Sequence, residues 1–134
     1  MHLPGVAREQ VYAALDTDEG RAAFWAESAI EADGTIHFHF INGECCTCRV
    51  LRRRPPVEWA IEYFGGPAVF ELATDGRGGT DLQLTHTGVA AHEWHETHAG
   101  WLNVLFPLKA WLVHGVDLRN HDRDRTWSDE YADQ

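Results

Sequence analysis

The stretch WHETHAGWLNVLFPLKAWL, residues 94–112, decides the fold. Its large side chains recur at spacings of 4, 3, 4, 3 and 4, which is the period of one face of an α-helix. The residues on this face are Trp94, His98, Trp101, Leu105, Leu108 and Leu112. We expect a long amphipathic helix from about Ala91 to His114, because Gly115 suits the left-handed position just past a helix end. Pro107 lacks an amide donor and should bend this helix.

The segment before this helix, residues 28–86, has a different period. Apolar and polar residues alternate over short runs, and turn residues such as Asp33-Gly34, Asn42-Gly43 and Gly65-Gly66 separate the runs. The pattern predicts six antiparallel strands in a meander. The side chains expected on the inward face are Ile36, Phe38, Phe40, Cys46, Cys48, Val50, Trp59, Ile61, Tyr63, Ala68, Phe70, Leu72, Leu82, Leu84 and His86.

Two short helices are expected before the strands, in residues 8–15 and 19–25, where helical spacing appears again. The predicted fold class is therefore α+β, with a curved six-stranded or seven-stranded antiparallel sheet wrapped around the long C-terminal helix. Residues 1–134 should form a single domain, with 120–134 as a C-terminal tail. A curled sheet that grips one helix leaves a pocket where the two diverge.

The charge of the chain limits its partners. It has 11 Lys and Arg against 21 Asp and Glu, a formal net charge of -10, which disfavours nucleic acid and anionic lipid. The one basic run, Arg52–Arg54, is cut short by Pro55-Pro56 and is expected to be a solvated loop. No apolar stretch reaches the roughly 20 residues of a membrane span, and no signal pattern opens the chain, so we expect a cytoplasmic protein.

The cysteines are three in number and lie within four positions, at Cys45, Cys46 and Cys48. An odd and crowded set is a poor disulfide framework, so reduced thiols are expected. Cys46 and Cys48 share one strand face, but no second cysteine pair exists to complete a four-ligand metal site. Structural burial is therefore the favoured interpretation of these thiols.

The histidine-rich run His92–His98 invites comparison with the helix motif of zinc proteases. That motif needs a second His four residues after the first, and the residues found there are Glu96 and Ala99. A metal shared by His95 and His98 with either His86 or a carboxylate stays an alternative. We expect no metal ligand, no cofactor and no need for zinc in folding.

Several segments, taken in order, resemble a known family. They are Val11–Trp25, Pro55–Glu58, Phe70–Leu72, the Gly-Thr-x-Leu-x-Leu-Thr-His-Thr-Gly strand at Gly79–Gly88, and Gly100–Arg119. Together they cover most of the chain. The chain resembles the START-type helix-grip (SRPBCC) superfamily, in the branch named for the activator of heat-shock protein 90 ATPase homologue.

This resemblance implies a helix-grip fold with an internal cavity for hydrophobic ligands, in a family with many bacterial members. Family members open with a β-strand before the first helix, whereas only Met1–Val6 precede Ala7 here, so that strand should be short, missing or replaced. The co-chaperone activity of the eukaryotic namesake involves a separate N-terminal domain, and it is not carried over to this chain.

The function expected from these features is the binding of an apolar small molecule, without turnover and with no catalytic residue assigned. The ligand should be aromatic, acyl or polyketide-like. The residues expected to contact it are Phe38, Trp59, Tyr63, Phe70, His86, His98, Trp101 and Leu105. One alternative is an enzyme of the cyclase, aromatase or hydrolase type that uses the cavity His and Tyr as acid or base. Another is a co-chaperone-like interaction domain, and a homodimer or a chaperone contact stays open.

Overall fold

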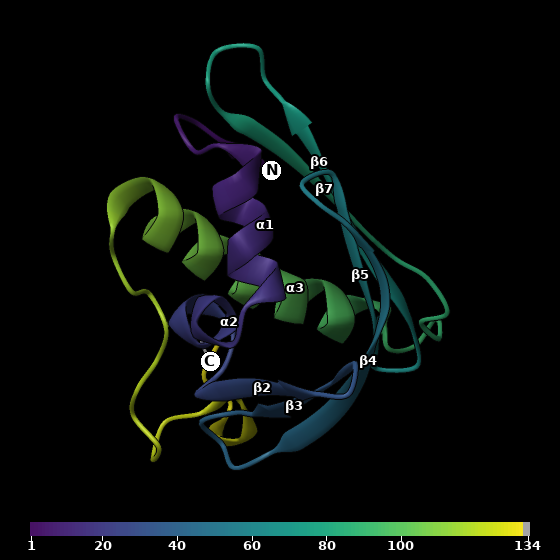
Figure 1. The fold of residues 1–134 in the computed structure, drawn as a ribbon. Helices are drawn as coiled ribbons and strands as arrows, with labels where there is room; N and C mark the ends of the chain where they lie inside the picture. The colour runs from purple at the N-terminus through teal and green to yellow at the C-terminus, as the bar shows by residue number, and fades with distance from the viewer. Residues whose placement is uncertain (133–134) are drawn as a thin grey trace.

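Seven strands form one antiparallel sheet in the computed structural model, which describes residues 1–132 (Figure 1). The order across the sheet is β1-β7-β6-β5-β4-β3-β2, so six of the strands follow one another as a meander. Their bounds are β1 His2–Leu3, β2 Ser28–Ala32, β3 Thr35–His39, β4 Cys45–Arg54, β5 Glu58–Tyr63, β6 Gly66–Thr74 and β7 Thr80–His86. The predicted curved antiparallel sheet is confirmed, in its seven-stranded form.

The additional strand is β1, which pairs with β7 through His2 opposite Asp81 and Leu3 opposite Thr80. The side chain of Leu3 is fully buried, which explains why so short a strand is held at the edge of the sheet. The strand before the first helix, expected to be short, missing or replaced, is therefore present in a short form.

The helices lie on the concave side of the sheet (Figure 1). They are α1 (Arg8–Asp16), α2 (Asp18–Phe24) and the long α3 (Trp94–Lys109), whose last turn widens into a π-helical segment, η1 (Ala110–His114). A single 3₁₀ turn, η2 (Trp127–Asp129), lies in the C-terminal tail. Gly115 follows η1 with φ 67°, the left-handed conformation expected after the helix end. The helix thus ends where the sequence predicts and begins at Trp94, three residues later than expected.

At the N-terminal end of α3, the residues that are buried differ from those expected on its apolar face. Trp101, Val104 and Leu108 are buried, but Trp94 is 55% exposed and His98 is exposed as well. The prediction that Trp94 faces inward is therefore wrong. Helical spacing identifies which residues share a face, but the first turns of α3 extend beyond the packed core and leave that face open.

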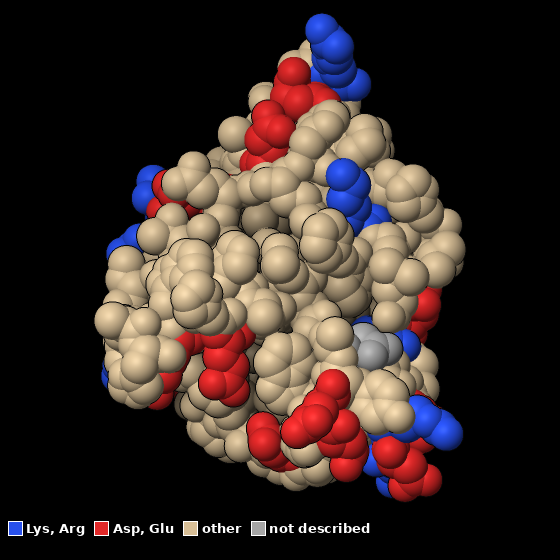
Figure 2. Space-filling model, turned by 180° about the vertical axis from the view of Figure 1, so that it is seen from behind, with Lys and Arg blue, Asp and Glu red and all other residues tan. Residues whose placement is uncertain are grey.

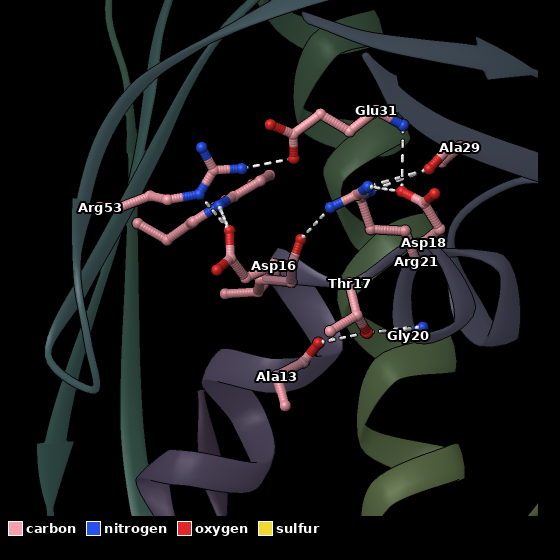
Figure 3. Close-up of polar contacts among 11 residues, drawn as sticks. Ala13, Asp16, Thr17, Asp18, Gly20, Arg21, Ala29, Glu31 and Arg53 are labelled. Carbon is pink, nitrogen blue, oxygen red and sulfur yellow. Dashed lines mark hydrogen bonds and ion pairs between the residues drawn. The ribbon is translucent and has the colours of Figure 1, made fainter. Parts of the chain in front are cut away.

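A buried arginine joins α2 to the first long hairpin. Arg21 is fully buried, and its guanidinium donates to the carbonyls of Leu15, at 3.0 Å, and Ala29, at 3.0 and 3.1 Å (Figure 3). It also pairs with Asp18, which in turn accepts from the backbone amide of Glu31 at 3.0 Å. These bonds satisfy carbonyls that would otherwise be buried without a partner.

A second arginine ties the helices to the middle of the sheet. Arg53 pairs with Asp16 at 2.6 Å and with Glu31, and Asp16 also accepts from the indole Nε1 of Trp59 at 2.9 Å (Figure 3). The prediction that Arg52–Arg54 form a loop is wrong, because these residues form the end of β4, although all three are solvent-exposed as expected. Each arginine has a carboxylate partner on a neighbouring element, which favours the extended conformation over a free loop.

Aromatic side chains fill the space between the sheet and α3. Trp25, just past the end of α2, contacts six other aromatic rings with centroids 5.1 to 6.3 Å away. These rings belong to Phe24, Phe38, Trp59, Tyr63, Phe70 and Trp101. Burial of such large rings supplies much of the hydrophobic stabilisation of the domain. The cluster also forms the floor of the candidate site.

Candidate functional site

A cavity of about 590 Å³ opens beside this aromatic cluster. It lies between the N-terminal half of α3, the β3–β4 loop, the β5–β6 turn and the segment after α2. Six aromatic side chains contribute to its lining: Trp25, Phe40, Tyr63, Phe64, Trp101 and Trp127. A volume of this size and an aromatic lining are typical of sites for small organic molecules.

The C-terminal tail forms one wall of the cavity. Arg119 donates to the carbonyls of Ala22 and Ala26 at the end of α2, and it pairs with Asp117 at 2.6 Å. These bonds hold the start of the tail against the body of the domain. The hydrogen bonds from Arg119 also keep the pKa of Asp117 well below its usual range.

The rest of the tail, up to residue 132, folds back over the opening. Asn42 in the β3–β4 loop donates to the Ser128 hydroxyl at 3.2 Å, and Asn103 on α3 donates to the Ala132 carbonyl at 2.7 Å. Thr126, which lines the cavity, is buried. The segment expected as a tail from residue 120 thus contacts the domain through Ser128 and Ala132 and has Thr126 buried.

His86 lies on the cavity wall, and two hydrogen bonds hold its imidazole in place. His86 is the last residue of β7, and strand alternation puts it on the same face as Leu82 and Leu84. Its Nε2 bonds the carbonyl oxygen of Tyr63 at 2.8 Å, and its Nδ1 bonds Nε1 of Trp101 at 3.1 Å. A carbonyl only accepts and an indole N–H only donates, so the imidazole carries its proton on Nε2. Both ring nitrogens are therefore occupied, which leaves no free lone pair for acid or base chemistry.

Tyr63 supplies a hydroxyl to the same region. This hydroxyl accepts a hydrogen bond from Nε1 of Trp25 at 3.2 Å, and burial raises the pKa of Tyr63 above its usual value. The phenol therefore stays protonated, and its proton remains available to an acceptor on a bound molecule. Tyr63 can orient a ligand by a hydrogen bond, but burial disfavours the phenolate that general-base chemistry would need.

The turn after Tyr63 places an exposed aromatic ring at the mouth. Phe64 has φ 37° and is 62% exposed. A left-handed backbone costs a residue other than glycine about 1 kcal/mol. The ring contacts that of Tyr63, with centroids 4.6 Å apart, but most of its surface stays exposed. An exposed aromatic side chain in a strained conformation beside a cavity is consistent with contact to a ligand.

The structure divides the predicted ligand-contacting residues into three groups. Tyr63, His86 and Trp101 line the cavity. Three others are buried beneath it, at exposures of 0 to 1%: Phe38, Trp59 and Phe70. The last two, His98 and Leu105, lie on the other side of α3 and line a second hollow of about 560 Å³ with Trp94 and Leu102. Eight residues expected at one site are thus spread over a cavity, the core below it and a neighbouring groove.

Other residues that line the cavity were not among the ligand-contacting residues predicted from the sequence. Trp25 was expected only as the end of a helix, and Trp127 lies in a segment without helical or strand periodicity. Phe40 was expected on the inward face, and Phe64 lies between two predicted strands. The excess of tryptophan in the chain was a signal for aromatic surroundings, but it did not identify which rings border the cavity.

The cysteine cluster lies outside the cavity lining. Cys46 and Cys48 have their sulfur atoms 3.6 Å apart, and Cys45 is exposed. The hydrogen bond from Cys48 lowers the pKa of the Cys46 thiol, whereas that bond and burial raise the pKa of Cys48. Among residues 1–132, no group of three or more His, Cys, Asp or Glu side chains is placed to hold a metal ion.

Comparison with solved structures identifies the fold. A crystal structure of a Staphylococcus saprophyticus protein shares 22% identity at TM-score 0.73, covering 89% of this chain and 96% of that one. The Aha1 dimer from Colwellia psychrerythraea shares 23% identity at TM-score 0.74, covering 86% and 93%. CalU16 from Micromonospora echinospora shares 20% identity at TM-score 0.66, covering 85% and 73%.

These similarities, together with the sheet and helix described above, show that the chain has the helix-grip fold. No protein-family model matches the chain, and no curated protein sequence matches it. Within residues 1–132, none of the helices combines the length and the apolar character needed to cross a membrane. The fold alone does not determine an activity, so function must be argued from the cavity.

Proposed function

We propose that this protein binds an apolar small molecule in the cavity between its sheet and α3, without chemical turnover. The observation that carries this proposal is the cavity of about 590 Å³, with the six aromatic side chains in its lining. The ligand should be aromatic, acyl or polyketide-like. The proposed family is that of the activator of heat-shock protein 90 ATPase homologue, and the proposed location is the cytoplasm.

The two cavity groups expected as acid or base, His86 and Tyr63, support binding over catalysis. Acid–base chemistry needs a group that can gain or lose a proton near neutral pH. His86 uses both nitrogens in bonds to Tyr63 and Trp101, and burial favours the neutral phenol of Tyr63. Their hydrogen bonds hold both side chains in a fixed orientation, which suits them to orient a bound molecule.

The test is a panel of fatty acids, aromatic hydrocarbons and polyketide-like compounds, followed by thermal unfolding and tryptophan fluorescence. A compound that binds the folded state alone should stabilise it by about 2.7 kcal/mol at a hundredfold excess over its dissociation constant. Phe40→Ala should weaken that binding because Phe40 lines the cavity. Phe106→Ala is the matched control, since Phe106 is 53% exposed on α3 outside the cavity.

Two outcomes would contradict the proposal. The first is a panel in which no compound changes the unfolding temperature or the fluorescence. The second is consumption of a bound compound that stops in His86→Ala while binding persists, because that result would favour the enzyme alternative. The dimer of the Colwellia neighbour supports a homodimer as a further proposal, which sedimentation of the pure protein would test.

A further inference from the structure

We propose that the ligand of this cavity carries a positive charge, as a lipophilic amine: an apolar, preferably aromatic, body with one protonated amino group. This inference rests on the proposed function, since it assigns a charge to the ligand of the same cavity. It is argued from the carboxylates at the mouth, from the absence of an available cation in the described lining, and from the aromatic walls.

Four carboxylates surround the opening, and they come from three different segments. They are Glu27 after α2, Glu44 in the β3–β4 loop, and Glu93 and Glu96 at the start of α3 and in its first turn. Acidic side chains gather in the lower part of the face drawn in Figure 2. In a chain with a formal net charge of -10, these carboxylates make the potential at the mouth negative.

The helix dipole of α3 does not reverse this potential. The N-terminus of a helix carries a partial positive charge that would favour an anionic ligand. Glu93 occupies the N-cap of α3 and Glu96 lies in its first turn, so the protein itself supplies anions at this helix end. A carboxylate on a ligand would compete with these two side chains.

No cation in the described lining is free to bind an anionic ligand. Arg119 is the single Lys or Arg among the lining residues within the described chain; its charge is paired with Asp117, and four of its five N–H donors are engaged. Its Nε and Nη2 bond Asp117, and its Nη1 bonds the carbonyls of Ala22 and Ala26. Because His86 also has both nitrogens occupied, a fatty acid or a phosphate would enter without a counterion.

The walls of the cavity suit a cation. Trp25, Tyr63 and Trp101 contact one another with ring centroids 5.0 to 5.7 Å apart, and all three line the cavity. The face of an aromatic ring attracts an ammonium group and at the same time excludes water around an apolar body. The combination of aromatic walls and carboxylates at the mouth therefore favours an amine over a neutral molecule of the same shape.

The test uses three probes with the same ring system: methylnaphthalene, naphthylmethylamine and naphthoate. Their dissociation constants for the full chain are measured by calorimetry or ligand-observed NMR at low ionic strength. Four charges roughly 10 Å from the bound amine should make it bind about tenfold tighter than the neutral probe. The preference should shrink in high salt, and naphthoate should bind more weakly than both.

Substitution of two of the carboxylates tests whether they cause the preference for the amine. The double variant Glu93→Gln with Glu96→Gln should reduce the preference for the amine about threefold and leave the neutral probe unchanged. Glu71→Gln is the control, because Glu71 is exposed on β6 away from the cavity. If naphthoate or methylnaphthalene bound as tightly as the amine, the charge inference would fail while the proposed function stood. If none of the three probes bound, both would fail.

Discussion

The bond between Trp101 and His86 is the feature of the site whose removal has the most specific consequences. Trp101→Phe keeps an aromatic ring in place but deletes the Nε1–H donor that holds Nδ1 of His86 at 3.1 Å. The hydrogen bond contributes about 1 kcal/mol, and the smaller ring forfeits about 1 kcal/mol of packing against Tyr63, Trp25 and Phe70. Urea unfolding should therefore show a loss of about 2 kcal/mol.

The matched control is Trp94→Phe on the same helix. Trp94 is 55% exposed, and its ring stacks on exposed His98, so the same chemical change should alter the unfolding free energy by less than about 0.5 kcal/mol. In the wild type, ¹⁵N NMR of the imidazoles should place the proton of His86 on Nε2. An equal effect of the two substitutions, or a proton on Nδ1, would refute the bonding scheme.

Three further predictions concern the buried arginine, the pH dependence of stability and the effect of a chelator. In urea unfolding, Arg21→Ala should lower the unfolding free energy by about 3–5 kcal/mol, because it leaves two buried carbonyls without a donor. The control Arg49→Ala removes an exposed ion pair and should lower it by less than about 1 kcal/mol. The lowered pKa of Asp117 means that its carboxylate adds stability above the unfolded pKa of about 3.9, and that this stability is lost as the pH falls toward the folded value. Asp117→Asn should therefore destabilise the protein at neutral pH, and its difference from the wild type should shrink below about pH 4 in a series of unfolding curves. Excess chelator should leave the unfolding temperature unchanged, since the described residues offer no complete metal site; a lowered temperature would reverse that expectation.

The sheet and the long helix were predictable because their sequence signals are periodic. Alternation placed Trp59, Ile61 and Tyr63 on one face of β5, and all three are buried as expected. Gly115 marked the helix end correctly. Such signals depend on which face of a single element is apolar, and that property is local in sequence.

The cavity was less predictable because it depends on where elements diverge. Periodicity assigned Phe38 and Tyr63 the same inward orientation, yet the first is sealed in the core and the second borders the cavity. The tail residues that close the opening, such as Thr126 and Trp127, have no periodic pattern at all. The bonds that hold this segment to the domain, such as those of Arg119 to Ala22 and Ala26 and of Asn42 to Ser128, join residues distant in sequence.

Gly100 allows a direct test of whether the cavity is the binding site. It lies in α3 and lines the cavity, and a Cβ atom added there would have no atom within 4 Å beyond its own helix backbone and chain neighbours. Gly100→Ala and Gly100→Leu should both fold, and each should gain about 0.5–1 kcal/mol from the loss of a helical glycine. The Leu side chain, unlike the Ala methyl, should fill part of the space that a ligand needs.

The decisive measurement is the dissociation constant of the most stabilising panel compound for the wild type, Gly100→Ala and Gly100→Leu. The account predicts binding to Gly100→Ala close to that of the wild type, and a loss of at least about tenfold for Gly100→Leu, because overfilling a packed site costs about 1–3 kcal/mol. Undiminished binding to a stably folded Gly100→Leu protein would contradict the claim that this cavity holds the ligand.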